Sequence, residues 1–158
     1  MRLTRATEYA FRSMRYLASQ KEERWYSIQE IAEAENMPIQ FLAKVMQHLT
    51  QAGLVHSACG KTGGYRLGRP ASQLKMADVL LAMEGPLSIN TCLMYPTECQ
   101  FVQTCKIHNV WAELQGAILG VLEKYSIAEL ATSVTEDDIP PRQRTRARKV
   151  RTAAPAAS

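Results

Sequence analysis

Three cysteines lie close together in the second half of this 158-residue chain. Cys92 is followed by six residues and Cys99, then by five residues and Cys105, then by two residues and His108. Thiolates in a loop, about five or six residues apart, can curl around an inorganic iron-sulfur core. The spacing therefore indicates an iron-sulfur cluster held by three thiolates, with one ligand position left open.

Two residues are candidates for the fourth ligand of such a cluster. His108 directly follows the cysteines, and Glu8 could offer a carboxylate from a partner subunit. Structural zinc is the alternative, since three cysteines and one histidine form an accepted zinc set. Zinc sites, however, usually contain a tighter cysteine pair than any found here. From the residues alone, a cluster, a zinc ion and no metal all remain open.

The four cysteines are expected to be reduced thiols rather than disulfides. The charged residues Arg2, Arg5 and Glu8 interrupt any hydrophobic export signal, and no apolar run is long enough for a membrane helix. Cytosolic proteins rarely contain structural disulfides. We therefore expect a soluble, cytoplasmic protein without a membrane partner, in which Cys59, far from the other three in sequence, is unligated.

The N-terminal half shows the pattern of a helix-turn-helix. Apolar residues at helical spacing predict a first helix over residues 5–19. Ser27 lies three residues before Glu30, which predicts a capping box at the start of a second helix that ends near Glu35. A third helix follows Pro38 and ends at Gly53, with a core stripe of Ile39, Leu42, Val45, Met46 and Leu49.

A β-hairpin is expected directly after these helices. Residues 54–59 and 65–67 have strand character, and a glycine-rich turn joins them. A helix-turn-helix followed by a hairpin is the order of elements in a winged helix. The expected fold is therefore mainly α with a small β-hairpin wing.

The third helix and the wing supply the candidate contacts to DNA. A recognition helix meets base edges and phosphates with the residues near its start and on its outer side. The hairpin turn brings a lysine between glycines that allow close approach of the backbone. The predicted DNA-binding residues are Gln40, Phe41, Lys44, Gln47, Gly60 and Lys61. The alternative is that the helical residues form only the solvated face of an ordinary helix.

A long helix is expected after the cysteines. Residues 76–84 predict a further helix that ends at Gly85-Pro86, and residues 92–105 lack an apolar period and predict a loop. Residues 108–125 then carry a wide apolar stripe over on the order of 25 Å of helix. We expect this stripe to pair with its copy in a homodimer, since two-fold symmetry suits two half-sites on DNA. Packing within the monomer is the alternative.

The net charge of +4 comes from the C-terminal end and is not evidence for a DNA-binding domain. Six of the 19 basic residues lie beyond Ile139 with no acidic residue among them, which leaves 13 basic against 15 acidic residues elsewhere. Such a segment has too few large apolar residues to fold alone. We predict three parts: residues 1–85 as a DNA-binding domain, residues 86–132 as a cysteine loop and dimerisation helix, and residues 133–158 as a disordered basic tail.

Taken together, these features resemble the family of IscR, NsrR and RirA. The resemblance rests on the opening residues 1–4, the helix-turn-helix, the wing ending at residues 63–67, and the three-cysteine loop before a helix with Trp111. It covers roughly residues 1 to 132. It implies a homodimeric winged-helix transcription regulator whose iron-sulfur cluster senses iron, cluster supply, nitric oxide or redox state.

The resemblance also implies that Cys92, Cys99 and Cys105 are the cluster ligands. His108 matches the histidine of the IscR type, which holds a 2Fe-2S cluster, and Glu8 matches the acidic position of the NsrR type, which holds a 4Fe-4S cluster. We favour His108 and 2Fe-2S, although the first gap is one residue longer than in the IscR type. Cys59 stands where the family often has a wing arginine, so Lys61 or Arg66 would have to replace it.

No nucleotide fingerprint, cofactor motif or paired acid and base indicates an enzyme. The expected function is therefore a cluster-sensing repressor or activator that binds an operator in double-stranded DNA. The alternative is a zinc-stabilised or metal-free winged-helix repressor that does not sense through a cluster.

Overall fold

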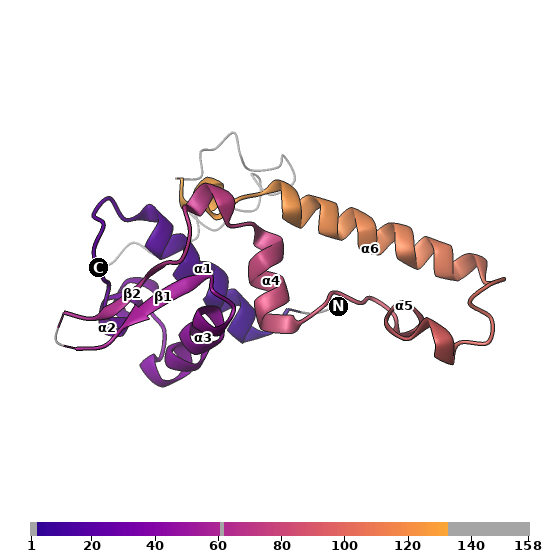
Figure 1. Ribbon diagram of the computed structural model, residues 1–158, viewed down its shortest axis with the longest axis horizontal. Helices are drawn as coiled ribbons and strands as arrows, with labels where there is room; N and C mark the ends of the chain where they lie inside the picture. The colour runs from indigo at the N-terminus through magenta and orange to yellow at the C-terminus, as the bar shows by residue number, and fades with distance from the viewer. Residues whose placement is uncertain (1–2, 61, 133–158) are drawn as a thin grey trace, which may run out of the picture.

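The computed structural model describes residues 3–60 and 62–132 and shows a body from which a helical arm extends (Figure 1). The predicted basic tail lies outside these residues. The described elements are α1 (Arg5–Ser19), α2 (Ile28–Glu35), α3 (Ile39–Gln51), β1 (Val55–Ala58), β2 (Gly64–Leu67), the 3-10 turn η1 (Ala71–Gln73), α4 (Met76–Glu84), α5 (Thr91–Met94), the 3-10 turn η2 (Pro96–Glu98), α6 (Lys106–Lys124) and α7 (Ile127–Ala131). The predicted fold class, mainly α with a hairpin wing, is confirmed.

Side-chain caps define where the first two helices begin. The hydroxyl of Thr4 accepts a hydrogen bond from the Thr7 backbone N–H and starts α1. The predicted capping box is present at α2, where Ser27 and Glu30 satisfy each other's backbone N–H groups. The Arg24 guanidinium, together with Ser27, lowers the pKa of Glu30 to about 2. These local bonds fix where α1 and α2 begin.

The core of the body lies between α1, α3 and the neighbouring helices. Buried apolar residues recur at helical spacing on both helices, as predicted. On α1 they are Ala10, Met14 and Leu17, and on α3 they are Leu42, Val45, Met46 and Leu49. The prediction for Ile39 was wrong: its side chain is 45% exposed in the first turn of α3.

The wing is a two-stranded antiparallel hairpin in which Val55 pairs with Leu67 and Ala58 with Gly64. Tyr26 extends it by one bridge, because its backbone exchanges hydrogen bonds with Tyr65 at 2.8 and 3.0 Å. Gly64 has φ +151° and lies against the Tyr26 backbone. The hairpin is therefore attached to the loop before α2 by backbone contact that leaves no room for a side chain.

Gly64→Ala is expected to destabilise the body by at least about 2 kcal/mol, because the backbone conformation strains any L side chain and the new methyl group meets a backbone that cannot move freely. An ideal Cβ at Gly64 would lie 2.6 Å from the Tyr26 carbonyl carbon. Urea denaturation measures the loss. Gly60→Ala is the matched control, since φ is also positive there but no atom lies within 4 Å. Equal losses in the two variants would show that the contact with Tyr26 does not matter.

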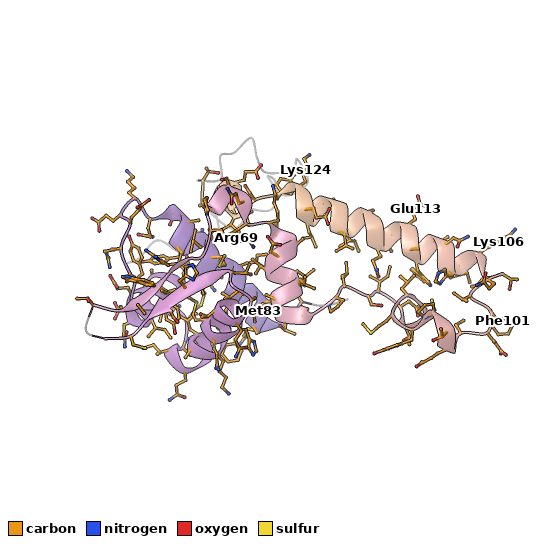
Figure 2. The ribbon with its side chains drawn as sticks, in the orientation of Figure 1. Arg69, Met83, Phe101, Lys106, Glu113 and Lys124 are labelled. Atoms are coloured by element: carbon orange, nitrogen blue, oxygen red, sulfur yellow. The ribbon has the colours of Figure 1, made fainter. Side chains whose placement is uncertain are left out.

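The arm consists of α6 and of the segment that runs beside it from the end of α4. The long helix is as predicted but begins two residues earlier, at Lys106, and none of its residues is buried. The segment before it was predicted to be a loop. That prediction was only partly right, because the segment contains the short helices α5 and η2. In Figure 2, Phe101 projects at the far end of the arm, and Lys106 and Lys124 mark the two ends of α6.

Candidate functional site

The outer face of α3 presents polar side chains to solvent. Gln40, Lys44 and Gln47 are all exposed, at spacings that put them on one side of the helix. Ala43 and Gln51, which the sequence analysis did not single out, are also exposed. No other element of the described chain covers this face. The arrangement has the shape and chemistry of a recognition helix that enters a major groove.

Phe41 has a different environment from the other predicted residues of α3. Its ring meets the ring of Tyr9 on α1 edge to face, with centroids 5.4 Å apart, and the side chain remains 40% exposed. Such aromatic pairs contribute about 0.5–1.5 kcal/mol beyond burial of area. Phe41 therefore helps to hold α3 against α1 while one edge of the ring stays open to a ligand.

A buried carboxylate fixes the turn between α2 and α3. The side chain of Glu35, only 7% exposed, accepts bonds from Arg12 at 3.1 Å and from Arg15 at 2.7 Å. The Arg12 guanidinium also donates to the Glu35 backbone carbonyl. Sequence reasoning missed this network because its members are 20 or more residues apart. It ties α1 to the residue just before the turn that orients α3.

The turn of the wing is only partly described. Gly60 is exposed with φ +108°, as expected for a turn, and the neighbouring Cys59 is an exposed free thiol. Lys61, the other predicted contact of the wing, lies outside the described residues. The part of the wing that is described points away from the body in Figure 1, as required for contact with a neighbouring groove.

The three clustered cysteines and His108 all belong to the arm. Cys92 lies in α5, Cys99 follows η2, and Cys105 is the N-cap residue of α6, so that His108 falls in the first turn of that helix. The three cysteines are free and half-buried. The Nδ1 atom of His108 is buried and has no hydrogen-bond partner among the described residues. A buried imidazole nitrogen without a partner is a ligand atom available for a metal.

These donors are not assembled around one point. Within residues 3–60 and 62–132, no three cysteine, histidine or acidic side chains are close enough together to hold one metal ion. Glu8, the alternative fourth ligand, lies on α1 in the body, where its exposed carboxylate is 3.9 Å from Arg12. The structure thus places Cys92, Cys99, Cys105 and His108 in one region without bringing them into a coordination sphere.

Backbone bonds tie the C-terminal end of α6 to the body, and one side-chain bond links the two segments of the arm. At one end, Met76 donates to the Tyr125 carbonyl at 3.0 Å, and Ile127 donates to the Leu74 carbonyl at 2.8 Å. Along the arm, the Ile89 N–H donates to the Gln115 side chain at 3.2 Å. The segment that follows α4 is therefore bonded to the middle of α6.

The start of α1 is bonded to the point where the chain leaves α4. One carboxylate oxygen of Glu84 accepts from the Thr4 N–H at 2.9 Å and from the hydroxyls of Thr4 and Thr7. The Thr7 hydroxyl, and then the Thr4 N–H, hold the pKa of Glu84 below its ordinary value. Gly85, with φ +77°, follows at once and turns the chain into the arm.

The arm exposes a row of large apolar side chains. Ile107, Val110, Leu114 and Val121 of α6 are 46–61% exposed, although the helical spacing of an apolar stripe predicts that such residues are covered. None of the described helices is long and apolar enough to span a bilayer. Apolar rows of this length usually mark a protein interface.

The sequence of the chain is similar to those of known transcription regulators and of a curated bacterial protein. A family model for Rrf2, described as an iron-dependent transcriptional regulator, matches residues 3–133. The curated protein aau3 of Rhizobium meliloti (strain 1021) is 37% identical over 131 residues, which cover 82% of this chain and 84% of that protein.

Solved structures share the fold at lower identity. IscR of T. potens superposes with a TM-score of 0.68 and 24% identity, over 89% of this chain and 93% of that one. CymR (YrzC), the global cysteine regulator of B. subtilis, superposes with a TM-score of 0.66 and 23% identity, over 85% and 99%. At these identities the likeness establishes the winged-helix fold and leaves the signal undetermined.

Proposed function

The chain belongs to the Rrf2 family of iron-dependent transcriptional regulators, and we propose that it senses its signal through an iron-sulfur cluster carried by the arm. As a member of this family it is a DNA-binding, winged-helix transcription regulator and not an enzyme. The observation that carries the proposal is the meeting in one arm of three free, half-buried thiols and an imidazole with an unpartnered buried nitrogen.

The chemistry of the donor set fits a cluster better than it fits a single hard cation. Thiolates and an imidazole are the ligands that iron-sulfur centres use, and a bound cluster supplies iron that reacts with oxidants and with nitric oxide. Cys92, Cys99 and Cys105 are the proposed ligands, with His108 as the favoured fourth and Glu8 of a partner subunit as the alternative. A 2Fe-2S cluster agrees with His108, and a 4Fe-4S cluster with Glu8. Because the donors are not assembled among the described residues, cluster binding would require the segment that carries them to rearrange.

We propose a homodimer formed through α6, acting in the cytoplasm. The exposed row of Ile107, Val110, Leu114 and Val121 supports this, since pairing of two such rows removes apolar surface from water. A two-fold axis between the two helices also presents two recognition helices to two half-sites of an operator.

The bonds at the two ends of the arm suggest how the cluster affects DNA binding. A rearrangement of the cysteine segment would change how α6 lies against α4, and α4 packs on α1 and α3. DNA and cluster then bias one conformational equilibrium. Coupling of this kind is typically worth about 1–3 kcal/mol, or roughly 5- to 150-fold in operator affinity.

Anaerobic purification tests the cofactor directly. A brown protein with charge-transfer absorption, containing iron and sulfide, supports the cluster, whereas a colourless protein containing zinc supports the zinc-stabilised alternative. Operator affinity is then compared for the loaded and the cluster-free dimer at one salt concentration. Equal affinities would remove the sensing role, even if iron is bound, and would favour a regulator that responds through another route.

Lys44→Ala is expected to weaken operator binding, because the only lysine or arginine on α3 would no longer contact a phosphate or a guanine. If Lys44 contacts a phosphate, affinity should fall for all DNA sequences, and the slope of log affinity against log salt concentration should become shallower by about 1. If it reads guanine, the loss should be confined to the operator. Fluorescence anisotropy over a salt series distinguishes these cases. Lys21→Ala, an exposed lysine on the loop before α2, is the matched control.

A further inference from the structure

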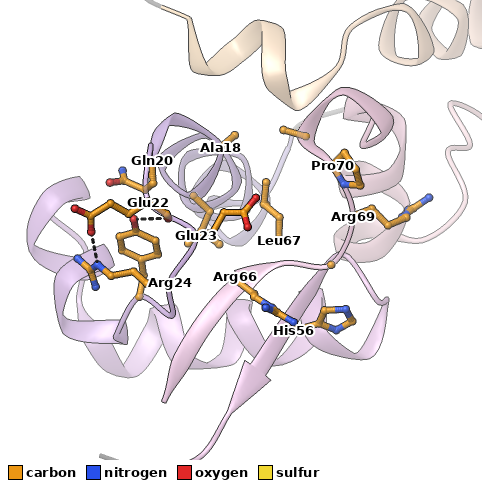
Figure 3. Close-up of a pocket in the computed structure, with 14 residues that line it drawn as sticks. Ala18, Gln20, Glu22, Glu23, Arg24, His56, Arg66, Leu67, Arg69 and Pro70 are labelled. Carbon is orange, nitrogen blue, oxygen red and sulfur yellow. Dashed lines mark hydrogen bonds and ion pairs between the residues drawn. The ribbon is translucent and has the colours of Figure 1, made fainter. Parts of the chain in front are cut away.

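A hollow of about 490 Å³ lies between the C-terminal end of α1, the loop before α2 and the wing (Figure 3), and no residue of the cysteine arm lines it. Its walls come from the C-terminal end of α1, the loop of residues 20–26, the strands of the hairpin and the segment that follows β2. The residues of α3 that face DNA do not line it. A ligand in this hollow would therefore leave the recognition helix free.

The charges around the hollow divide into a satisfied set and a free set. The Arg24 guanidinium is bound by Glu22 at 3.1 Å and by Glu30 at 2.7 Å, so it is neutralised within the chain. Glu23, whose carboxylate lies between the α1 end and the wing in Figure 3, has no ion-pair partner among the described residues. It offers one negative charge to a ligand.

Two arginines supply the opposite charge. The Arg66 guanidinium stacks on the ring of Trp25, 4.5 Å from its centroid, and pairs with no carboxylate of the described chain. Stacking holds the planar guanidinium in place, which favours a bidentate carboxylate ligand. Arg69 is 3.9 Å from Asp78, but one oxygen of Asp78 already accepts the Lys75 N–H at 2.9 Å. His56 lies beside Arg66 as its cross-strand partner.

The remaining wall is apolar. Leu17 and Ala18 of α1 line the hollow together with Leu67 and Pro70. An uncharged stretch between two polar groups of a ligand would fit against this wall. The volume falls within the range of small-molecule pockets, about 300–1,000 Å³.

We propose that this hollow binds a small peptide-like acid with one ammonium group and two carboxylates. Arg66 matches one carboxylate, and Arg69 matches the other in exchange for its 3.9 Å pair with Asp78. Glu23 matches the ammonium group, and the apolar wall matches the chain between them. Because the ligand would bridge α1 and the wing, its binding would fix the wing relative to α3 and so change operator affinity. This site is separate from the cysteine arm and adds a second, metal-independent input.

The full-length reduced protein is titrated separately with S-methylglutathione, L-glutamate and succinate. Binding is measured by calorimetry and by the NMR chemical shifts of the wing. S-methylglutathione has the required charges and no thiol that could attack a cluster, L-glutamate has the charges without the length, and succinate lacks the ammonium group. We expect S-methylglutathione to bind at least about tenfold more tightly than succinate. Tighter binding of L-glutamate would assign the same site to a free amino acid.

Two variants test the assigned contacts. Arg66→Ala should weaken S-methylglutathione binding about tenfold or more, and Glu23→Gln should weaken S-methylglutathione but not succinate. Arg66→Lys keeps the charge and checks that any loss is not a folding defect, and Lys21→Ala alters a neighbouring charge that does not line the hollow. No saturable binding of any probe up to about 10 mM, or binding unchanged in both variants, would overturn the proposal. Either result would leave the proposed cluster and the DNA-binding function standing, because the titration requires neither a bound cluster nor bound DNA.

Discussion

Cys105→Ala is expected to abolish binding of iron and sulfide while the winged helix stays folded. Removing one of three proposed thiolate ligands leaves the cluster with too few strong donors, and a neighbouring backbone cannot replace a thiolate. The protein purified without oxygen should lose its charge-transfer absorption. Iron and sulfide should fall to background, and operator affinity should equal that of the cluster-free wild-type protein.

The fold should survive because Cys105 contributes little to the core. It is half-buried at the N-cap of α6, and its side chain makes no capping hydrogen bond. The buried apolar residues belong to the body, and none belongs to α6. Far-ultraviolet circular dichroism and the urea midpoint of the cluster-free protein should therefore change little.

Cys59→Ala provides the matched control for this experiment. It removes an exposed thiol from the wing, so iron content should not change. If Cys105→Ala still bound iron and sulfide at the wild-type level, the proposed ligand set would be wrong. If it unfolded the whole chain, Cys105 would have a structural role that the described contacts do not include.

Much of the body was predictable because its determinants are local. The capping pair of Ser27 and Glu30, the apolar period of α1 and the glycines of the hairpin each involve residues a few positions apart. Ile39 shows the limit of that approach. Its place in the helical period is correct for the core, but whether an element covers the first turn of α3 depends on tertiary packing.

The candidate site was less predictable than the body. The spacing of the cysteines indicated candidate metal ligands. The helix α5 was missed because four residues are too few to show the apolar period of a helix. The bonds from Arg12 and Arg15 to Glu35 and from Thr4 and Thr7 to Glu84 join residues far apart in sequence. They are visible only in the folded chain, yet they connect α1 to the turn before α3 and to the start of the arm.

These connections mean that the arm is attached to the body at a few defined points. The end at α7 is the strongest of them, because it combines backbone bonds with a buried side chain. Ile127 is fully buried in the core, and the capping box of Ser126 and Glu129 fixes the start of α7. If α6 transmits the state of the cluster, this anchor is where its angle relative to the DNA-binding body is set.

Ile127→Ala is accordingly expected to destabilise the protein by about 2–5 kcal/mol and to uncouple cluster and operator binding. The stability loss comes from the removed methyl groups and the cavity that they leave. The loss of coupling follows because α7 is no longer held against α1, so α6 can change its angle without moving the body. Urea denaturation gives the first quantity, and the ratio of operator affinities with and without the cluster gives the second.

Leu130→Ala is the control that separates the two effects. Leu130 is only partly buried against the same core, so its truncation should cost less stability and leave Ile127 in place. A variant that is destabilised yet keeps the wild-type affinity ratio shows that stability alone does not set the coupling. If Ile127→Ala also kept the full ratio, the signal would not pass through the end of α6. The packing of α6 against α4 and the contacts of Glu84 with the start of α1 would then remain as described routes from the arm to the recognition helix.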